Sequence, residues 1–300
     1  MGITGVGKSS FISYFSNTAV TGDGLESCTS TVSIHAARVA GMNIFLIDTP
    51  GFDDTNRSDT DILREIATWL DIPFKRSIKL AGIIYLHRIT DNRLSGSALK
   101  NLRLFRKLCG DGGLSCVVLA TTMWNMVTDQ SVAVQREAEL KSNPEFWQGL
   151  IAKGSVVLRQ DNGKLSAIRI IQHILSKKKR GTLAIQDEMN SGKDLSQTKV
   201  GLEVGSELAM LEKKYKEEIE KLKRELQEAR RERDLRAELE IANERAAQEL
   251  MMKKVQEDKR RLEVNVEELQ KEAAQRWRPG SGRKEKSKHA KADKRSCKLM

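Results

Sequence analysis

Short apolar runs alternate with stretches of helical spacing over the first two-thirds of the chain. The runs have the length and the flanking turn residues of buried strands; they are Val32–Ala37, Asn43–Thr49, Leu80–Leu86, Ser115–Thr121 and Ser155–Leu158. The stretches between and around them with helical spacing are Ser9–Phe15, Asp59–Leu70, Ser97–Leu108, Val132–Lys141 and Ser166–Ser176. This alternation predicts an α/β domain over residues 1–200, with a mostly parallel sheet flanked by helices.

The pattern changes to a long charged helix over residues 201–276. Past Gly205 this stretch holds neither glycine nor proline, and its composition favours helix. Apolar residues recur there with coiled-coil spacing in two seams: Tyr215, Ile219, Leu222, Leu226 and Ala229, then Val255, Leu262, Val266, Leu269 and Ala273. Arg233 and Arg236 interrupt the seam between them. We expect a coiled coil with a modest drive to self-associate, the alternative being a single solvated helix.

Charge and cysteine content refine this organisation. The chain carries +11, of which +8 falls in the stretch from Arg276 to Met300, so the basic charge belongs to a tail and not to a globular surface. Arg278-Pro279-Gly280 ends the helix, and residues 277–300 are expected to form a disordered tail. The four cysteines show no C-x-x-C spacing, which favours reduced intracellular thiols. With no signal peptide or long apolar run, we expect a cytoplasmic protein.

The opening residues, MGITGVGKSS, match the pattern G-x-x-x-x-G-K-[ST]. Backbone N–H groups can wrap a phosphate closely only where side chains are absent, which explains Gly2 and Gly7. In such a loop Lys8 neutralises the β- and γ-phosphate oxygens, and the Ser9 hydroxyl binds Mg²⁺. The alternative is a glycine-rich loop of no function.

A second motif, FLIDTPGFDD, favours the functional interpretation. Asp48 ends an apolar strand and supplies a carboxylate toward Mg²⁺, while the Gly51 N–H can sense the γ-phosphate. The two motifs in this order predict a Mg²⁺–nucleotide site, with Ser9, Asp48 and Thr29 toward the metal. Thr31 is a second candidate for the Thr29 role. The expected nucleotide contacts in the two motifs are Gly2, Thr4, Gly5, Val6, Gly7, Lys8, Ser9, Ser10 and Gly51.

These motifs, followed by a strand and the stretch LHRIT, resemble the septin/Toc/GIMAP branch of P-loop GTPases, the immunity-associated type. The resemblance covers roughly residues 1–200, and with the helical segment it is closest to fungal G-domain proteins that carry a C-terminal coiled coil. It implies GTP as the ligand and a dimer of G domains. Leu86, Arg88 and Thr90 match the family's L-x-R-x-T, in which the arginine stabilises the transition state on the partner's nucleotide. Arg88 is therefore a catalytic candidate, in addition to Lys8. The alternative, which we weight equally, is that Arg88 only forms an ion pair with Asp91.

Two departures from GTPase patterns bear on activity. Phe52 stands where many GTPases use glutamine to orient water, so we expect slow hydrolysis within one monomer. Where [NT]-K-x-D is expected after the fourth strand, the chain has T-M-W-N, which ends at Asn125. Trp124 or Met123 can stack on a purine, while Asn125 offers one donor and one acceptor instead of two acceptors. GTP and ATP both stay open on these residues.

The last four residues, from Cys297 to Met300, fit a farnesylation box, and the polybasic stretch upstream is the second signal for stable membrane anchoring. We therefore expect Cys297 to be lipidated and the protein to be partly membrane-associated. The alternative is an unmodified basic tail that contacts only phosphates, with no sequence-specific nucleic-acid binding.

Taken together, the residues predict a slow, Mg²⁺-dependent GTPase, activated by G-domain dimerisation, that acts as a switch or scaffold. Its homodimer forms through the G domain, the coiled coil or both. The alternatives are a non-catalytic nucleotide-binding module and a coiled-coil adaptor with an inactive G domain. In the related design an apolar strand leads into Gly2, and here only Met1 precedes it. We expect the first strand to be missing through a misplaced start, and nucleotide binding to be weak as a result.

Overall fold

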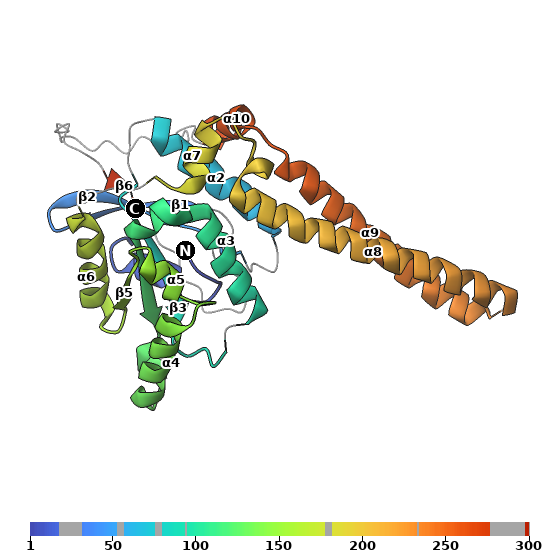
Figure 1. The fold of residues 1–300 in the computed structure, drawn as a ribbon, viewed down its shortest axis with the longest axis horizontal. Helices are drawn as coiled ribbons and strands as arrows, with labels where there is room; N and C mark the ends of the chain where they lie inside the picture. The colour runs from blue at the N-terminus through green and yellow to red at the C-terminus, as the bar shows by residue number, and fades with distance from the viewer. Residues whose placement is uncertain are drawn as a thin grey trace.

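The computed structural model describes residues 1–17, 32–52, 57–75, 80–93, 95–177, 182–232, 234–276 and 298–299. An α/β body carries a helical arm that projects away from it (Figure 1). The strands are β1 Ser33–Val39, β2 Met42–Asp48, β3 Ile83–Arg88, β4 Val117–Thr122, β5 Val156–Arg159 and β6 Lys298–Leu299. The α-helices are α1 Lys8–Ser13, α2 Asp59–Lys75, α3 Gly96–Gly113, α4 Gln130–Ser142, α5 Gln148–Ala152, α6 Gly163–Ser176, α7 Ala184–Asn190, α8 Lys199–Glu232, α9 Leu235–Leu262 and α10 Val266–Arg276. Short 3-10 turns lie at Leu114–Cys116, Trp124–Met126 and Leu195–Gln197.

The strands form two three-stranded sheets. In the first, β4 lies between β3 and β5, and all three run parallel. Residues 117–121 of β4 are fully buried, as expected of a central strand covered on both faces. In the second sheet β1 and β2 form an antiparallel hairpin, and β6 pairs in parallel with the other edge of β2. The prediction of an α/β domain with a mostly parallel sheet flanked by helices is confirmed.

Met1 extends the first sheet by a single residue. Its amino group donates to the Ile84 carbonyl at 2.7 Å, and the Leu86 N–H donates to the Met1 carbonyl at 2.9 Å. This is the hydrogen-bond pattern of a parallel pair. The pairing places Gly2 beside the carboxyl end of β3, where the opening loop begins.

Two apolar clusters hold the body together, and helices contribute to each. One cluster gathers α1 and α6 residues with the strands, including Phe11, Ile12 and Ile170. The other gathers residues of α2, of α3 and of the segment around Trp147. It also includes residues of the arm where the arm joins the body, at the start of α8 and near the end of α9. Cys109 and Cys116 are buried and do not form a disulfide with each other. None of the described helices is both long and apolar enough to cross a bilayer.

The arm is a helical hairpin in place of the single long helix that the sequence suggested. Helix α8 ends at Glu232, and α9 starts at Leu235. The Asp234 side chain caps the start of α9, because it accepts hydrogen bonds from the Arg236 and Ala237 N–H groups. The ion pair of Arg230 with Glu238 lies near the turn (2.7 Å). Contacts at both the turn and the base show that α9 runs back antiparallel along α8 (Figure 1). The interruption of the predicted seam therefore falls where α8 ends and α9 begins.

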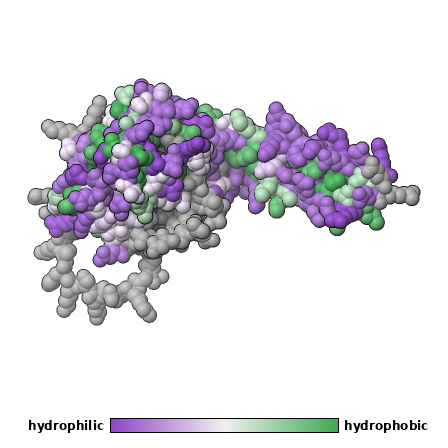
Figure 2. All heavy atoms as spheres, turned by 90° about the horizontal axis from the view of Figure 1, so that it is seen from below, coloured by the Kyte–Doolittle hydropathy of each residue, from purple (hydrophilic) through white to green (hydrophobic). Residues whose placement is uncertain are grey.

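Folding back buries the two predicted seams inside one chain. Ile219, Leu222 and Leu226 of the first seam are at most 7% exposed. Val255, Leu262 and Leu269 of the second are buried likewise. Figure 2 shows that hydrophilic residues cover most of the arm, with apolar residues gathered toward its outer part. The exposed apolar side chains of α9 are Leu235, Leu239, Leu250 and Met251.

Candidate functional site

The loop between Met1 and α1 has the backbone that its glycines allow. Gly2, Gly5 and Gly7 have φ angles of 131°, 77° and 87°, in the region that favours glycine. A Cβ on Gly2 would lie 2.4 Å from the Leu86 carbonyl oxygen, so a side chain does not fit there. The loop thus approaches β3 closely and presents its backbone without side chains at the glycine positions, as a phosphate-binding loop requires.

Lys8 is the first residue of α1 and folds back over the loop. Its Nζ donates to the carbonyls of Gly2 (3.1 Å) and Ile3 (2.8 Å). The ammonium group is therefore held at the mouth of the loop, where the β- and γ-phosphates of a nucleotide would lie.

The second motif meets the first at its serine. The Ser9 hydroxyl donates to Asp48 Oδ2 at 2.6 Å, although 39 residues separate them. Asp48 ends β2 and is 3% exposed. The structure thus brings the loop serine and the strand-end aspartate into contact, next to the loop lysine.

The pair Ser9–Asp48 fits a magnesium ion in its chemistry. Mg²⁺ prefers oxygen ligands and is bound in nucleotide sites by one or two protein oxygens together with phosphates and water. Among the described residues no group of three His, Cys, Asp or Glu side chains could hold a metal by itself. Thr29, the third predicted ligand, lies outside the described residues, as does the predicted lipidation site Cys297.

Thr122, at the end of β4, holds the opening loop through a hydrogen bond, a role that the sequence did not reveal. Its hydroxyl donates to the Val6 carbonyl at 3.0 Å, and Val6 itself is fully buried. The sequence pattern assigns Thr122 only to the start of the base-recognition motif. The sequence feature that could have indicated this role is a hydroxyl residue at the carboxyl end of a buried strand.

Arg88 is paired within its own chain. It ends β3, and its Nε lies 2.9 Å from Asp91 Oδ1. A Cβ on Gly5 would lie 3.2 Å from its Nη1, so the guanidinium sits next to the loop. The ion pair is the alternative geometry that the sequence left open.

The region expected to read the base is largely packed into the body. Trp124 is 5% exposed, and its Nε1 donates to the Thr121 hydroxyl at 3.0 Å. The Arg159 guanidinium covers one face of the ring, 4.1 Å from its centroid. Stacking of Trp124 on a base on that face would require Arg159 to move. Asn125 is exposed and free of this packing.

Arg159 is held over Trp124 by a buried carboxylate. Its Nε and Nη2 donate to the two oxygens of Glu137 at 3.0 and 2.7 Å, a bidentate geometry. Burial raises the pKa of Glu137, but the hydrogen bonds from Arg159 and Lys141 outweigh burial, and the pKa falls below its usual range. Arg159 is thus a fixed part of the site, one that the sequence did not reveal because it lies 35 residues after Trp124.

His87, the residue before Arg88, is buried against Trp147 (ring centroids 5.9 Å apart). Burial lowers the pKa of His87 from 6.5 to about 4, with Arg88 acting in the same direction against Asp91. The folded protein keeps the ring neutral, whereas the unfolded chain takes up a proton below about pH 6.5.

Stability should therefore fall as the pH is lowered from about 6.5 toward 4, by up to about 1.4 kcal/mol per pH unit from this group. His87→Leu removes this titrating group. As the pH is lowered over that window, the difference in the free energy of unfolding between the unaltered protein and the variant should therefore shrink or change sign. Urea unfolding at a series of pH values measures both profiles. Parallel profiles would contradict a neutral buried His87.

The N-terminal part of the chain matches a known family. Residues 1–95 match the family model of the 50S ribosome-binding GTPase, and this range contains both nucleotide motifs. The prediction of a P-loop GTPase domain is supported at this level, while the septin/Toc/GIMAP branch and the fungal likeness stay predictions. No curated protein matches the chain.

Solved structures of Toc33 from Arabidopsis thaliana are similar at low identity. A dimerization-deficient mutant is 14% identical, with 60% of this chain and 84% of that chain covered and a TM-score of 0.47. The complex with Mg²⁺ and GMPPNP is 16% identical (61% and 85% covered, TM-score 0.44). The complex with GDP and Mg²⁺ is 15% identical (60% and 84% covered, TM-score 0.45). We draw no functional conclusion from likeness at this level.

Proposed function

We propose that this chain binds GTP with Mg²⁺ at its opening loop. The observation that carries the proposal is the convergence of Lys8, Ser9 and Asp48, with Ser9 and Asp48 2.6 Å apart. Lys8 would bind the β- and γ-phosphates, and the loop N–H groups would surround them. Ser9 and Asp48 would hold Mg²⁺, which neutralises phosphate charge and polarises the bond that hydrolysis breaks. The match of residues 1–95 to a GTPase family supports GTP as the nucleotide.

Hydrolysis is proposed to be slow in one subunit and faster in a dimer. Phe52 follows Gly51 and is buried in the core, 6% exposed, so it cannot orient water. Arg88 lies beside the loop but is engaged by Asp91. A second subunit could supply a guanidinium to the transition state once that ion pair opens.

This mechanism predicts that turnover per subunit rises with protein concentration. In Arg88→Ala the rise should disappear, with at least about a tenfold loss at high concentration and little change in GTP affinity. Phosphate release measured across a dilution series tests it, and Arg93→Ala, which removes an exposed charge from the same surface, is the matched control. Concentration-independent turnover, or equal loss in both variants, would contradict activation by Arg88.

A non-catalytic nucleotide-binding module is the second candidate function, and the buried Phe52 is the observation that favours it. In that case GTP occupancy alone would control assembly. Tight binding with no phosphate release at any protein concentration would select this candidate.

The proposed homodimer would form through the G domains. Ile219, Leu222, Leu226, Val255, Leu262 and Leu269 of the two predicted seams are already buried within this chain, so these residues do not need a second chain to cover them. The arm is instead available as a scaffold, and the exposed apolar residues of its α9 helix are the surface it offers.

A further inference from the structure

A cavity of about 100 Å³ lies between the two sheets. Residues 46–49, at the carboxyl end of β2, line it on one side, and Ile83, Ile84 and Leu86 of β3 line it on the other. Successive residues of a strand point to opposite faces of its sheet, so a cavity that both kinds of residue line lies at a strand edge. Since β1 covers one edge of β2 and β4 covers one edge of β3, the cavity lies between their second edges.

The other walls of this space, which we call the β2–β3 gap, are apolar. Phe11 and Ile12 of α1 line it, and so do Ile66 and Trp69 of α2. Residues of α1 and of α2 belong to different core clusters, so the gap is closed by a helix on each face. Two strand edges and two apolar helix faces are the surroundings of a central strand in a parallel sheet.

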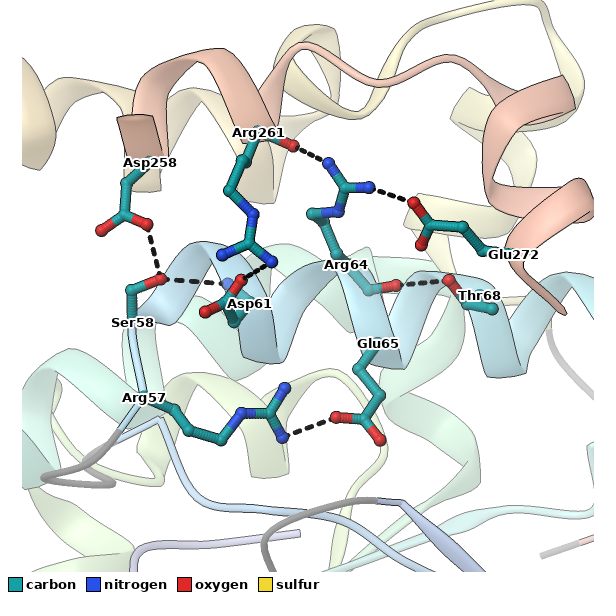
Figure 3. Close-up of polar contacts among 9 residues, drawn as sticks. All are labelled: Arg57, Ser58, Asp61, Arg64, Glu65, Thr68, Asp258, Arg261 and Glu272. Carbon is teal, nitrogen blue, oxygen red and sulfur yellow. Dashed lines mark hydrogen bonds and ion pairs between the residues drawn. The ribbon is translucent and has the colours of Figure 1, made fainter. Parts of the chain in front are cut away.

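Helix α2 is held in place from its other side. Asp61 pairs with Arg261 of α9 at 2.5 Å, and Arg64 pairs with Glu272 of α10 (Figure 3). With 3.6 residues per turn, Ile66 lies on the opposite side of the helix from Asp61 and Arg64. The arm therefore supports this wall of the gap through contacts that leave the lining residues uninvolved.

The C-terminal segment enters the gap along β2. Lys298 pairs with Ile44 and Leu299 with Phe45, in the parallel direction, so β6 runs toward the opening loop as β2 does (Figure 1). This pairing stops at Phe45, and the lining of the cavity begins at the next residue, Leu46. Within the part of the chain that the structure describes, no other strand pairs with this edge of β2. The cavity thus lies directly ahead of β6.

Met1 bounds the gap at its opposite end. It pairs with β3 through Ile84 and Leu86 (2.7 and 2.9 Å), and it also lines the cavity. Alternate residues of a strand direct their N–H and C=O groups to the same edge, where they pair with a neighbouring strand. A parallel strand in the gap would therefore pair with β2 on one side and with β3 on the other, and would join the two sheets into one.

We propose that the β2–β3 gap is a strand-binding site and that the C-terminal segment of this chain is its occupant. The site takes an extended peptide as a parallel strand, with main-chain hydrogen bonds for attachment and apolar walls that select its side chains. The argument for this occupant is its register, because Lys298 and Leu299 lie on the β2 edge in the direction that leads to the cavity. Attachment to the same chain also gives the segment a high effective concentration.

This binding acts on β2, the strand that ends in Asp48. A strand that is paired on both edges exchanges its amide hydrogens more slowly than one with an open edge. The C-terminal segment therefore stabilises β2 whether or not a nucleotide is bound, and the inference does not depend on the proposed function.

Proline substitution in the full chain tests the site. The double variant Lys298→Pro/Leu299→Pro removes both N–H groups of β6, and proline is not accommodated inside a paired strand. Lys286→Pro/Ser287→Pro is the matched control, since it places the same change and the same loss of charge in the basic tail, apart from β6. The readout is hydrogen exchange along β2 and β4, without nucleotide and at two protein concentrations. A synthetic peptide of residues 291–300, and its scrambled form, are then added to the double variant.

The double variant should speed exchange in β2 by at least about threefold, because the hydrogen bonds on one edge are lost. Exchange in β4 should not change, and the control should match the unaltered protein. The peptide should restore the protection of β2, whereas the scrambled peptide should not.

Unchanged exchange in β2 would overturn the site, and so would equal acceleration in β4, which indicates general unfolding. Restoration by the scrambled peptide would overturn recognition in register. Protection of β2 that rises with protein concentration would assign the occupant to a second copy and overturn the assignment to the chain's own segment.

Discussion

Replacing Lys8 by alanine is expected to lower the affinity of the chain for Mg²⁺–GTP by about 100-fold or more. Removing one partner of a close charge pair at an interface costs about 2–5 kcal/mol, and each 1.4 kcal/mol is about tenfold in affinity. The structure already holds Nζ at the mouth of the loop through the Gly2 and Ile3 carbonyls. Titration with a fluorescent GTP analogue in excess Mg²⁺ measures the loss.

The matched control is Lys107→Ala, which removes an exposed lysine from α3. It should leave the affinity unchanged. Thermal unfolding of both variants should stay close to that of the unaltered protein, because hydrogen bonds of the Lys8 kind contribute about 1 kcal/mol each. An affinity in Lys8→Ala within about threefold of the unaltered value, less than about 0.7 kcal/mol, would place the nucleotide elsewhere.

Trp147→Ala is expected to destabilise the body by about 3–5 kcal/mol. Trp147 is 1% exposed, its N–H donates to the Leu140 carbonyl at 3.0 Å, and its ring packs edge-on against His87 at the end of β3. Truncation leaves a cavity behind the strand that carries Arg88. Chemical denaturation measures the loss of stability.

Phe146→Ala is the comparison, because Phe146 is the adjacent aromatic residue and is only half-buried. It should cost no more than about half as much, given the smaller apolar area removed from water. The Trp147 variant should also weaken the pH dependence assigned to His87, since water can then reach the ring. Equal losses at the two positions would contradict the assignment of Trp147 as the core residue here.

The strands, the body helices and the nucleotide motif could be predicted because the determining patterns are local. Buried strands are continuous apolar runs, and each predicted run has a strand in the structure. Asp48 and Ser9 were predicted to share an ion because strand-end and loop positions have fixed roles in such sheets. Their contact follows from topology, which the order of elements already restricts.

The arm's path could not be predicted from the sequence. A heptad seam looks the same whether it faces a second chain or a returning helix of its own. The decision rests on Glu232–Leu235, where Asp234 caps a new helix, and on ion pairs that match residues far apart, such as Lys259 with Glu212. The packing of α10 on α2 is likewise a long-range contact, with Arg64 and Glu272 separated by 208 residues.

The packing of the base-recognition segment could not be predicted from the sequence either, because it depends on contacts between distant residues. Trp124 could be read as a stacking residue or a core residue, since a strand-end aromatic serves either purpose. In the structure Trp124 belongs to the apolar core, and one face of its ring is covered by Arg159, itself fixed by Glu137 from α4. None of these pairings leaves a periodic trace in the sequence, because each depends on how separate elements meet.

Direct titration of the full chain with GTP, with Mg²⁺ and then with the metal chelated, tests the central claim most directly. A site built from Lys8, Ser9 and Asp48 should bind one GTP per chain and lose affinity when Mg²⁺ is removed. The match of residues 1–95 to a GTPase family predicts in addition that ATP competes more weakly than GTP. Absence of saturable GTP binding, binding that does not depend on Mg²⁺, or equal competition by ATP would contradict the proposed GTP site.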